Sequence, residues 1–233
     1  MIESNRIISD VIYLGQCTYP ESFAIQEECL QKVLNFGSTK ILGCEYDRVL
    51  TLGKRVPMEQ LQNDFRLKQF SIHSTDRGGL ITLHNRGQLV IYPLLSLREM
   101  ALGVRDYLRV LCRTTEFFLR QHYGIESHWK FDHPDGLFVG NQKIAFIGIR
   151  VDRGISKHGI SLNICNDTSE FGLFTACGQE GLSVTNIQTL CPQTAMGDLK
   201  LIFHRWCEEF HRQLQGNMKF QCNQSEVLLD QGH

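Results

Sequence analysis

Three stretches of the chain repeat apolar residues at the spacing of a helix. The first, residues 20–36, opens with Pro20 and is followed by Gly37, and these residue types favour the first turn and the end of a helix. The second covers residues 97–123, and the third covers residues 196–214. The sequence therefore predicts three helices.

Short β-type runs, most of them bounded by glycine, asparagine or aspartate, fill the space between these helices. They outnumber the helices, and several are too close in sequence to be joined by a helical crossover. We therefore expect an α+β (α/β) fold, with a mixed, largely antiparallel sheet and helices packed on it. The predicted strands are residues 49–52, 80–83, 89–92, 136–139, 143–151 and 160–165.

Length and composition indicate an ordinary folded protein. The chain has 233 residues, of which 42% are hydrophobic and 21% charged, close to the averages for globular proteins. Internal repeats, charge blocks and Ser/Gly linkers are missing from the sequence, so we expect a single domain over residues 1–233. The polar end of the chain after Lys219 predicts fraying over the last ~12 residues.

Charge and hydropathy argue against nucleic-acid and membrane partners. Lys and Arg together number 24 against 25 Asp and Glu, so no global field would attract a polyanion. The N-terminus lacks the basic start and apolar core of a signal peptide, and the apolar run at 89–95 is interrupted by Pro93. We expect a cytoplasmic protein.

The nine cysteines form no Cys-x-x-Cys pair, which fits neither a disulfide framework nor a zinc ribbon. In a reducing compartment most of them should be small buried hydrophobic residues. His204, Cys207 and His211 share one predicted helical face at ligand-like spacing, and this face is explained either by a metal or by packing.

A first candidate segment begins at Arg77-Gly78-Gly79 and continues through Thr82 and His84. Paired glycines let a ligand or another backbone approach closely, and the polar side chains lie at the strand ends. The alternative is a plain tight turn. A phosphate loop is excluded elsewhere, because Gly53-Lys54 has no glycine at the required spacing and is followed by arginine.

Two further segments each contain one reactive residue type. A hairpin through Gly140-Asn141 leads into an apolar strand that Lys143 opens, so its ammonium lies either in apolar surroundings or, as at many strand edges, in water. Cys177 lies in a glycine-flanked loop, where a thiol is accessible to substrate and to a cation that would stabilise its thiolate.

In combination and in this order, these segments resemble the lipoyl(octanoyl) transferase family over residues 49–187. The resemblance rests on Val49-Leu50-Thr51-Leu52-Gly53, the Arg-Gly-Gly block with His84 and Gly87-Gln88, the strand of Lys143, His158-Gly159 with Leu162-Asn163, and Cys177-Gly178 with Gly181. It implies a single α/β domain related to biotin protein ligases and lipoate-protein ligases.

The resemblance also implies an activity, its partners and its site. The family moves an octanoyl group from octanoyl-acyl carrier protein to a lysine of lipoyl domains in 2-oxoacid dehydrogenases or of the glycine cleavage H protein, with no cofactor or metal. By resemblance, Cys177 carries the acyl group and Lys143 is its partner. The implied acyl pocket comprises Arg77, Gly78, Gly79, Leu80, Ile81, Thr82, Leu83, His84, Phe146, Ile147, Gly148, Gly159, Ile160 and Ser161.

Four positions depart from the family pattern. Leu83 replaces an aromatic residue, Arg86 a proline, Phe146 a small residue and Ala176 a proline. Phe146 would shorten the acyl tunnel if its ring points into it.

The implied chemistry suits these residue types. Acyl transfer from a thioester to an amine is downhill, so a cysteine thioester conserves the activation without ATP. A free thiol, with a pKa of ~8.5, is mostly protonated at neutral pH, and a nearby cation such as Lys143 would increase the thiolate fraction. The same lysine would then shuttle protons in both half-reactions.

Two other functions remain open at this point. An ATP-dependent lipoate-type ligase would use the lysine to hold an acyl-adenylate and leave the cysteine idle. A non-catalytic acyl-binding or carrier-docking protein on the same fold would form no acyl-enzyme. ATP dependence and acyl-enzyme formation separate the three.

The second predicted helix carries a row of arginines on the side away from its apolar stripe: Arg98, Arg105, Arg109, Arg113 and Arg120. Such a face is either solvated, with partial neutralisation by Glu116, or a docking surface for an acidic carrier protein. If it docks the carrier, reversing Arg105 and Arg109 to Glu should raise the KM for the carrier and weaken its salt dependence in steady-state kinetics. An unchanged KM would exclude this surface.

Overall fold

The computed structural model describes residues 8–56, 68–130, 133–173 and 182–230. Its helices are α1 (Tyr19–Phe36), α2 (Val104–Tyr123), α3 (Ile187–Leu190) and α4 (Leu199–Asp230), with a 3₁₀ helix, η3, at Thr168–Leu173. The strands are β1 (Asp10–Gln16), β2 (Lys40–Glu45), β3 (Arg48–Leu52), β4 (Ser71–Ser74), β5 (Ile81–Asn85), β6 (Gln88–Leu94), β7 (His128–Lys130), β8 (His133–Val139), β9 (Gln142–Asp152) and β10 (Ile155–Asn163).

The strands form two sheets. The larger has seven strands in the order β1-β2-β6-β10-β9-β8-β7, and the smaller has three in the order β4-β3-β5. In the larger sheet only β1 and β2 pair in parallel, across the connection made by α1. In the smaller sheet β3 is parallel to β4 and antiparallel to β5. The predicted fold class, a mixed and largely antiparallel sheet with packed helices, is confirmed.

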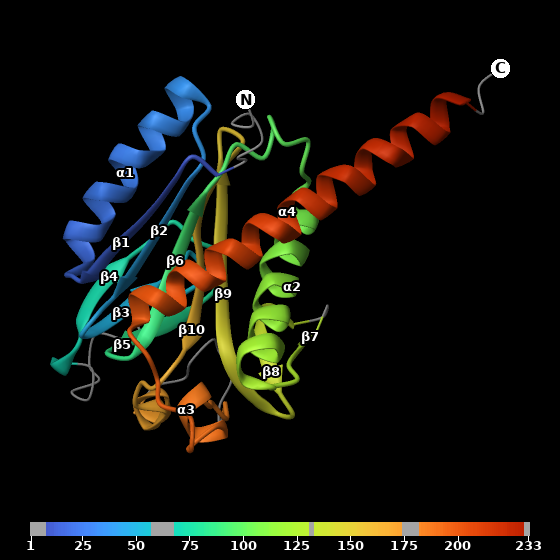
Figure 1. Ribbon diagram of the computed structural model, residues 1–233. Helices are drawn as coiled ribbons and strands as arrows, with labels where there is room; N and C mark the ends of the chain where they lie inside the picture. The colour runs from blue at the N-terminus through green and yellow to red at the C-terminus, as the bar shows by residue number, and fades with distance from the viewer. Residues whose placement is uncertain (1–7, 57–67, 131–132, 174–181, 231–233) are drawn as a thin grey trace.

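Helices cover both faces of the seven-stranded sheet (Figure 1). On β6, Leu89 and Ile91 belong to the core cluster that contains α2 and α4, whereas Val90 and Tyr92 belong to the cluster that contains α1. This division follows from the alternation of side chains along a strand. Because β6 is apolar on both sides, it forms the centre of a three-layer structure.

Local sequence signals explain the ends of α1. Thr18 accepts from the backbone N–H of Glu21, and the Glu21 carboxylate accepts from that of Thr18, so both form a capping box. At the other end Gly37 has a φ of 64°, a left-handed conformation that glycine adopts without strain. The predicted helix over residues 20–36 is confirmed.

The second predicted helix begins later than expected. α2 starts at Val104, after Gly103 at its N-cap, so the expected start at residue 97 is wrong. Leu97 and Leu102 are buried, but they lie in a turn closed by a hydrogen bond from the Leu102 N–H to the Leu97 carbonyl. The helix was predicted too early because these buried turn residues have the sequence spacing of a helix. Arg98 consequently lies outside the helix.

The third predicted helix differs at both ends. α4 begins at Leu199 rather than residue 196 and continues to Asp230, past Lys219, after which we expected fraying. Figure 1 shows α4 crossing the seven-stranded sheet and extending beyond it at the C-terminal end.

Four strands were not predicted: β1, β2, β4 and β7. β2 is buried along nearly its whole length, so it has no polar alternation to reveal it, and β7 has only three residues. The hairpin through Gly140 is confirmed, with β8 and β9 antiparallel and a φ of 58° at that glycine.

Four cysteines in the described part of the chain are buried, as expected: Cys29, Cys44, Cys112 and Cys207. Within that same part, every helix is either too short or too polar to cross a membrane.

α4 packs closely against the sheet at Gly43 of β2. A Cβ built on Gly43 would lie 2.5 Å from the fully buried ring of Phe203. Only glycine therefore leaves room for this aromatic ring.

We predict that Gly43→Ala lowers the free energy of unfolding by about 1–3 kcal/mol, because an added methyl overpacks this contact. Urea unfolding monitored by circular dichroism measures the change. Combining it with Phe203→Leu should recover part of the loss. The matched control is Gly216→Ala on α4, the helix that carries Phe203. Nothing lies within 4 Å of the added Cβ there, so this substitution should leave the free energy of unfolding unchanged or raise it. Equal effects at both glycines would contradict the packing argument.

Candidate functional site

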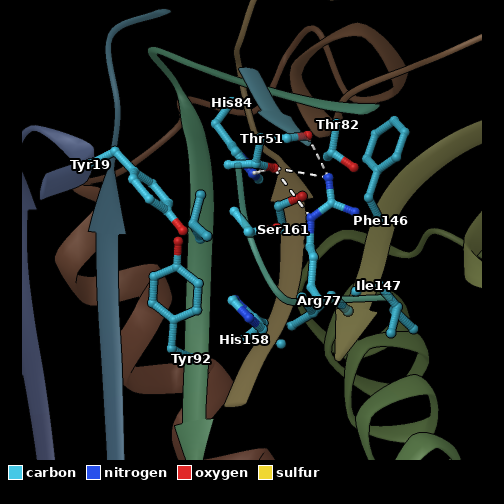
Figure 2. Close-up of a pocket in the computed structure, with 15 residues that line it drawn as sticks. Tyr19, Thr51, Arg77, Thr82, His84, Tyr92, Phe146, Ile147, His158 and Ser161 are labelled. Carbon is cyan, nitrogen blue, oxygen red and sulfur yellow. Dashed lines mark hydrogen bonds between the residues drawn. The ribbon is translucent and has the colours of Figure 1, made fainter. Parts of the chain in front are cut away.

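A narrow cavity of about 30 Å³ lies between the two sheets and α1. Thr82 and His84 of β5 face Tyr92 of β6 and Ser161 of β10 across it, as Figure 2 shows. Most of its lining is apolar or uncharged. The lining residues are Tyr19, Thr51, Thr75, Arg77, Thr82, His84, Val90, Tyr92, Phe146, Ile147, Gly148, His158, Gly159, Ile160 and Ser161.

Arg77 is the main charged group in this lining, and it is only 7% exposed. Its Nη2 donates to the carbonyl of Thr51 at 2.6 Å and to that of Leu80 at 2.8 Å, while Nη1 donates to the carbonyl of Gly78 at 2.9 Å. These bonds hold the loop before β5 against β3. The guanidinium thus stabilises the shape of the cavity.

A chain of buried hydrogen bonds starts at this guanidinium and crosses from the small sheet to the large one. Arg77 Nε donates to Thr51 Oγ1 at 3.3 Å, and that hydroxyl lies 3.3 Å from His84 Nε2. His84 Nδ1 donates to Gln88 Oε1 at 2.7 Å, and Gln88 Nε2 donates to Asn163 Oδ1 at 2.9 Å. Figure 2 draws the first of these bonds.

The chain ends at Lys143. Asn163 Nδ2 donates to the Thr185 carbonyl, and the Thr185 N–H donates to the Lys143 carbonyl, both at 2.9 Å. Because the Gln88 amide nitrogen donates to Asn163, its oxygen must accept, so His84 Nδ1 carries a proton. When the ring is neutral, Nε2 accepts from the Thr51 hydroxyl.

Burial explains why His84 is neutral. Desolvation of the ring lowers its pKa from 6.5 to about 4, although the hydrogen bond to Gln88 acts in the opposite direction. The positive charge of Arg77 contributes to this lowered pKa.

A second ionisable cluster lies at the other end of the cavity. His158 has a φ of 58° and places Nε2 2.6 Å from Asp76 Oδ1. The hydrogen bond from His158, with help from nearby Lys157 and Arg150, holds the pKa of the Asp76 carboxyl well below its usual range. Burial lowers the pKa of His158 despite this contact. The left-handed backbone at a non-glycine residue is strained, as is common at functional sites.

Lys143 begins the buried part of β9 and is fully buried. Its Nζ lies 5.0 Å from the centre of the Phe146 ring and 5.4 Å from that of Phe138, so two aromatic faces contact the amine. Gly136 makes room for this side chain, since a Cβ there would lie 2.4 Å from Lys143 Cε. Of the two possibilities left open by the sequence, a solvated strand edge or apolar surroundings, the structure shows apolar surroundings for Lys143.

Cys177 lies outside the described residues, but the chain on both sides of it is placed. Leu173 and Leu182 both pack against the cluster that contains Phe146. The Lys143 N–H donates to the Ser183 carbonyl at 2.8 Å.

The structure brings nine of the fourteen predicted pocket residues together around the cavity: Arg77, Thr82, His84, Phe146, Ile147, Gly148, Gly159, Ile160 and Ser161. Gly78, Gly79 and Leu80 belong to the loop that Arg77 holds, with the Gly78 N–H bonded to the Ile149 carbonyl. Ile81 and Leu83 do not line this cavity. Alternation along β5 turns both toward the cluster of Leu50 and Phe70 instead.

Sequence analysis missed six lining residues: Tyr19, Thr51, Thr75, Val90, Tyr92 and His158. Thr51 and His158 lie within motifs that carried the family resemblance, so the motifs contained the signal. Tyr19 comes from α1, and nothing in the sequence indicates that this helix reaches the cavity.

Comparison with known proteins now identifies the family. A family model described as the lipoyl protein ligase A/B catalytic domain matches residues 18–208. The chain is 39% identical to an octanoyltransferase of Cellvibrio japonicus over 187 residues, 79% of this chain and 84% of that protein. It is 35% identical to an octanoyltransferase of Halorhodospira halophila over 81% of this chain and 85% of that protein.

The chain belongs to the octanoyltransferases of the lipoyl protein ligase A/B family. The resemblance noted in the sequence is therefore confirmed, as is the enzyme class, an acyltransferase.

Solved structures agree on the fold. A lipoate protein ligase from Thermoplasma acidophilum superposes with a TM-score of 0.66 at 13% identity, over 89% of this chain and 84% of that one. A biotin protein ligase from Aquifex aeolicus gives 0.56 at 14% identity, over 91% of this chain and 73% of that one. At such low identity the likeness establishes the fold alone, which is the one expected of this octanoyltransferase family.

Two surface hypotheses have different outcomes in this family member. The arginine face of α2 loses Arg98, which lies before the helix, and keeps four exposed members: Arg105, Arg109, Arg113 and Arg120. The docking of a carrier protein on this face stays a prediction. Glu116, expected to neutralise that face in part, accepts from the Trp129 N–H at 2.9 Å and also interacts with the charges of Arg113 and Arg120.

The face of α4 for which a metal or packing was left open lies beside the N-terminal strand. His204, Cys207 and His211 do line one groove with Ile8 and Val11. Among the residues that the structure places, however, no group of three His, Cys, Asp or Glu is arranged to hold a metal ion. Cys207 is buried in the core between α4 and the sheet, so packing explains the face.

We predict that His84 makes the fold less stable in mild acid. The unfolded state binds a proton below pH 6.5, whereas the folded state, with a pKa of about 4, does not. The contribution of His84 to the free energy of unfolding is therefore fully present above pH 6.5 and falls as the pH drops toward 4. At pH 5 the loss from this residue is about 2 kcal/mol. Urea unfolding at pH 7.5 and pH 5 measures the loss.

The control for this experiment is His84→Gln, which keeps hydrogen-bonding groups but does not titrate. It should be less stable than the wild type at pH 7.5 and lose less on acidification. His158 and the carboxylates contribute equally to both proteins, so they cancel in the comparison. An identical pH dependence in the two proteins would show that His84 is not responsible.

Proposed function

We propose that this octanoyltransferase-family protein transfers an octanoyl group through a thioester on Cys177, with Lys143 as the proton carrier. The observation that carries the proposal is the buried amine of Lys143, 5.0 Å from a ring that lines the cavity. Backbone hydrogen bonds tie this lysine to Ser183 and Thr185, within eight residues of Cys177. A buried amine beside an acyl-binding cavity can exchange a proton with a nucleophile, and a thiol is suitable.

The first half-reaction loads the enzyme. Lys143, in its amine form, takes the proton of the Cys177 thiol, and the thiolate attacks the thioester carbonyl of octanoyl-acyl carrier protein. The bond from the carbonyl carbon to the carrier sulfur breaks, and the carrier thiolate takes the proton back from Lys143. A new thioester has replaced the old one, so ATP is not required.

The second half-reaction unloads it. The amine of the acceptor lysine attacks the Cys177 thioester and gives up a proton to Lys143, which passes it to the departing Cys177 thiolate. An amide forms and the free thiol returns. The acyl chain would lie in the cavity between the sheets throughout, in contact with Ser161, Gly148 and Gly159.

The relatives indicate the acceptor class, lipoyl domains. We propose octanoyl-acyl carrier protein as donor and the lipoyl domains of 2-oxoacid dehydrogenases or the glycine cleavage H protein as acceptors, in the cytoplasm. The uncharged cavity lining around Phe146, Ile147 and Ile160 fits the alkyl chain that donor and acceptor share.

Intact-protein mass spectrometry after mixing with octanoyl-acyl carrier protein, without ATP, tests the proposal. We expect one octanoyl addition on the wild type, none on Cys177→Ser, and loss of the addition once a lipoyl domain is supplied. Lys143→Ala should form the acyl-enzyme at least about 100-fold more slowly, because it lacks the proton acceptor.

Matched controls are Cys165→Ser, which removes an exposed thiol, and Lys157→Ala, which removes a cation at the far end of the cavity. Both should acylate at nearly the wild-type rate. Addition to Cys177→Ser would refute the thioester. Modification of a lipoyl domain only with ATP would indicate a ligase, and carrier binding without any acylation would indicate a non-catalytic protein.

A further inference from the structure

Phe146 forms the wall of the cavity nearest to Lys143. It lies three residues along β9 from the lysine, is only 3% exposed, and lines the cavity. In the sheet it pairs with Ser161 of β10, whose neighbour on the same face is Gly159. An acyl chain attached near Lys143 must therefore pass this ring before it reaches the rest of the cavity.

The ring has little freedom to move aside. It stacks on Phe171 with the ring centres 4.9 Å apart and an angle of 5° between their planes. Behind it lie Leu50, Phe70 and Leu83 in one buried cluster. Turning Phe146 away from the cavity would break a parallel stack inside a packed core, where empty space is scarce.

Space beyond the ring is small. The cavity volume of about 30 Å³ holds two or three water molecules, at about 10–15 Å³ for each. On the same face of the sheet, the next pair after Phe146 and Ser161 is Gly148 with Gly159, and Arg77 packs over Gly148. Phe146 is thus the large lining side chain beside Lys143, where an incoming acyl chain enters.

We propose that Phe146 sets the upper length of the acyl chain that this enzyme accepts. This inference rests on the proposed function and adds a specificity-determining residue to it. The Phe146 ring narrows the passage next to the reacting groups. Beyond a certain chain length, each added methylene group of the acyl chain therefore has no space in the cavity. The cavity is smaller than an octanoyl chain, so any acyl chain must widen it, and a longer chain must do so further against the fixed ring of Phe146.

The test is the rate of acyl-enzyme formation with hexanoyl-, octanoyl-, decanoyl- and dodecanoyl-acyl carrier protein. For the wild type we expect about a tenfold or greater fall from octanoyl to dodecanoyl. Phe146→Ala should remove most of this fall, and Phe146→Leu, which keeps the core filled, should lie between them. Thermal unfolding checks that both variants are folded.

Phe70→Ala is the matched control, since it removes an aromatic ring from the same cluster without touching the cavity lining. Its chain-length profile should equal that of the wild type. The inference is wrong if Phe146→Leu and Phe146→Ala keep the wild-type profile, or if Phe70→Ala shifts it equally.

A second readout separates this inference from the proposed function. Calorimetric binding of the free hexanoic to dodecanoic acids to Cys177→Ser needs no chemistry at the thiol. If the wild type forms no acyl-enzyme with any chain, the thioester proposal fails, and the binding profiles of Cys177→Ser with and without Phe146→Ala still decide the length limit. Equal profiles there would overturn it.

Discussion

A chain of buried hydrogen bonds holds the two sheets at a fixed separation, because losing any one of these bonds leaves a buried polar group without a partner. From Arg77 to the Lys143 carbonyl, each donor has one acceptor, and each group is shielded from water. Removing one partner would leave another buried polar group unsatisfied, which costs about 1–3 kcal/mol. The cavity keeps its width because these groups must keep their partners.

A second buried network fixes the approach to the segment that carries Cys177. Glu170 of η3 accepts from Asn85 Nδ2 at 2.9 Å and pairs with Arg48 Nε at 2.8 Å. Asn166 donates to Asn85, and Asn186, after the segment, donates to the Asn166 carbonyl. The chain therefore leaves and re-enters the described structure at neighbouring points, both anchored to β5.

The sequence predicted this fold well where one local signal decided the outcome. Pro20 and Gly37 at the ends of α1 and the glycine of the β8–β9 hairpin act within a few residues, so they are visible in a single chain. β2 and the start of α2 depend on packing with distant elements, and their local patterns misled us. Leu97 has the spacing of a helix but lies in a buried turn.

The candidate site shows the same division. Residues named through family motifs gathered at one cavity, because those motifs record a three-dimensional arrangement. Tyr19 and Tyr92 were missed, since their contribution arises from how α1 lies on the large sheet. Leu83 was placed in the lining by its position in a motif, whereas the alternation along β5 turns it to the opposite side. A family motif shows which strand lies at the site, but the face on which each side chain of that strand lies depends on how the strand pairs with its neighbours.

The pairing of Gly148 with Gly159 has a consequence for how the cavity can recognise its contents. Neither position accommodates a Cβ, which would lie 3.0 Å from Arg77 Cδ at the first and 2.2 Å from the Ile91 carbonyl oxygen at the second. The space that a side chain would need is already filled, by Arg77 over Gly148 and by β6 beside Gly159. A side chain at either position would push the guanidinium or the neighbouring strand away, so the outline that the cavity presents to its contents depends on two residues that contribute no side chain.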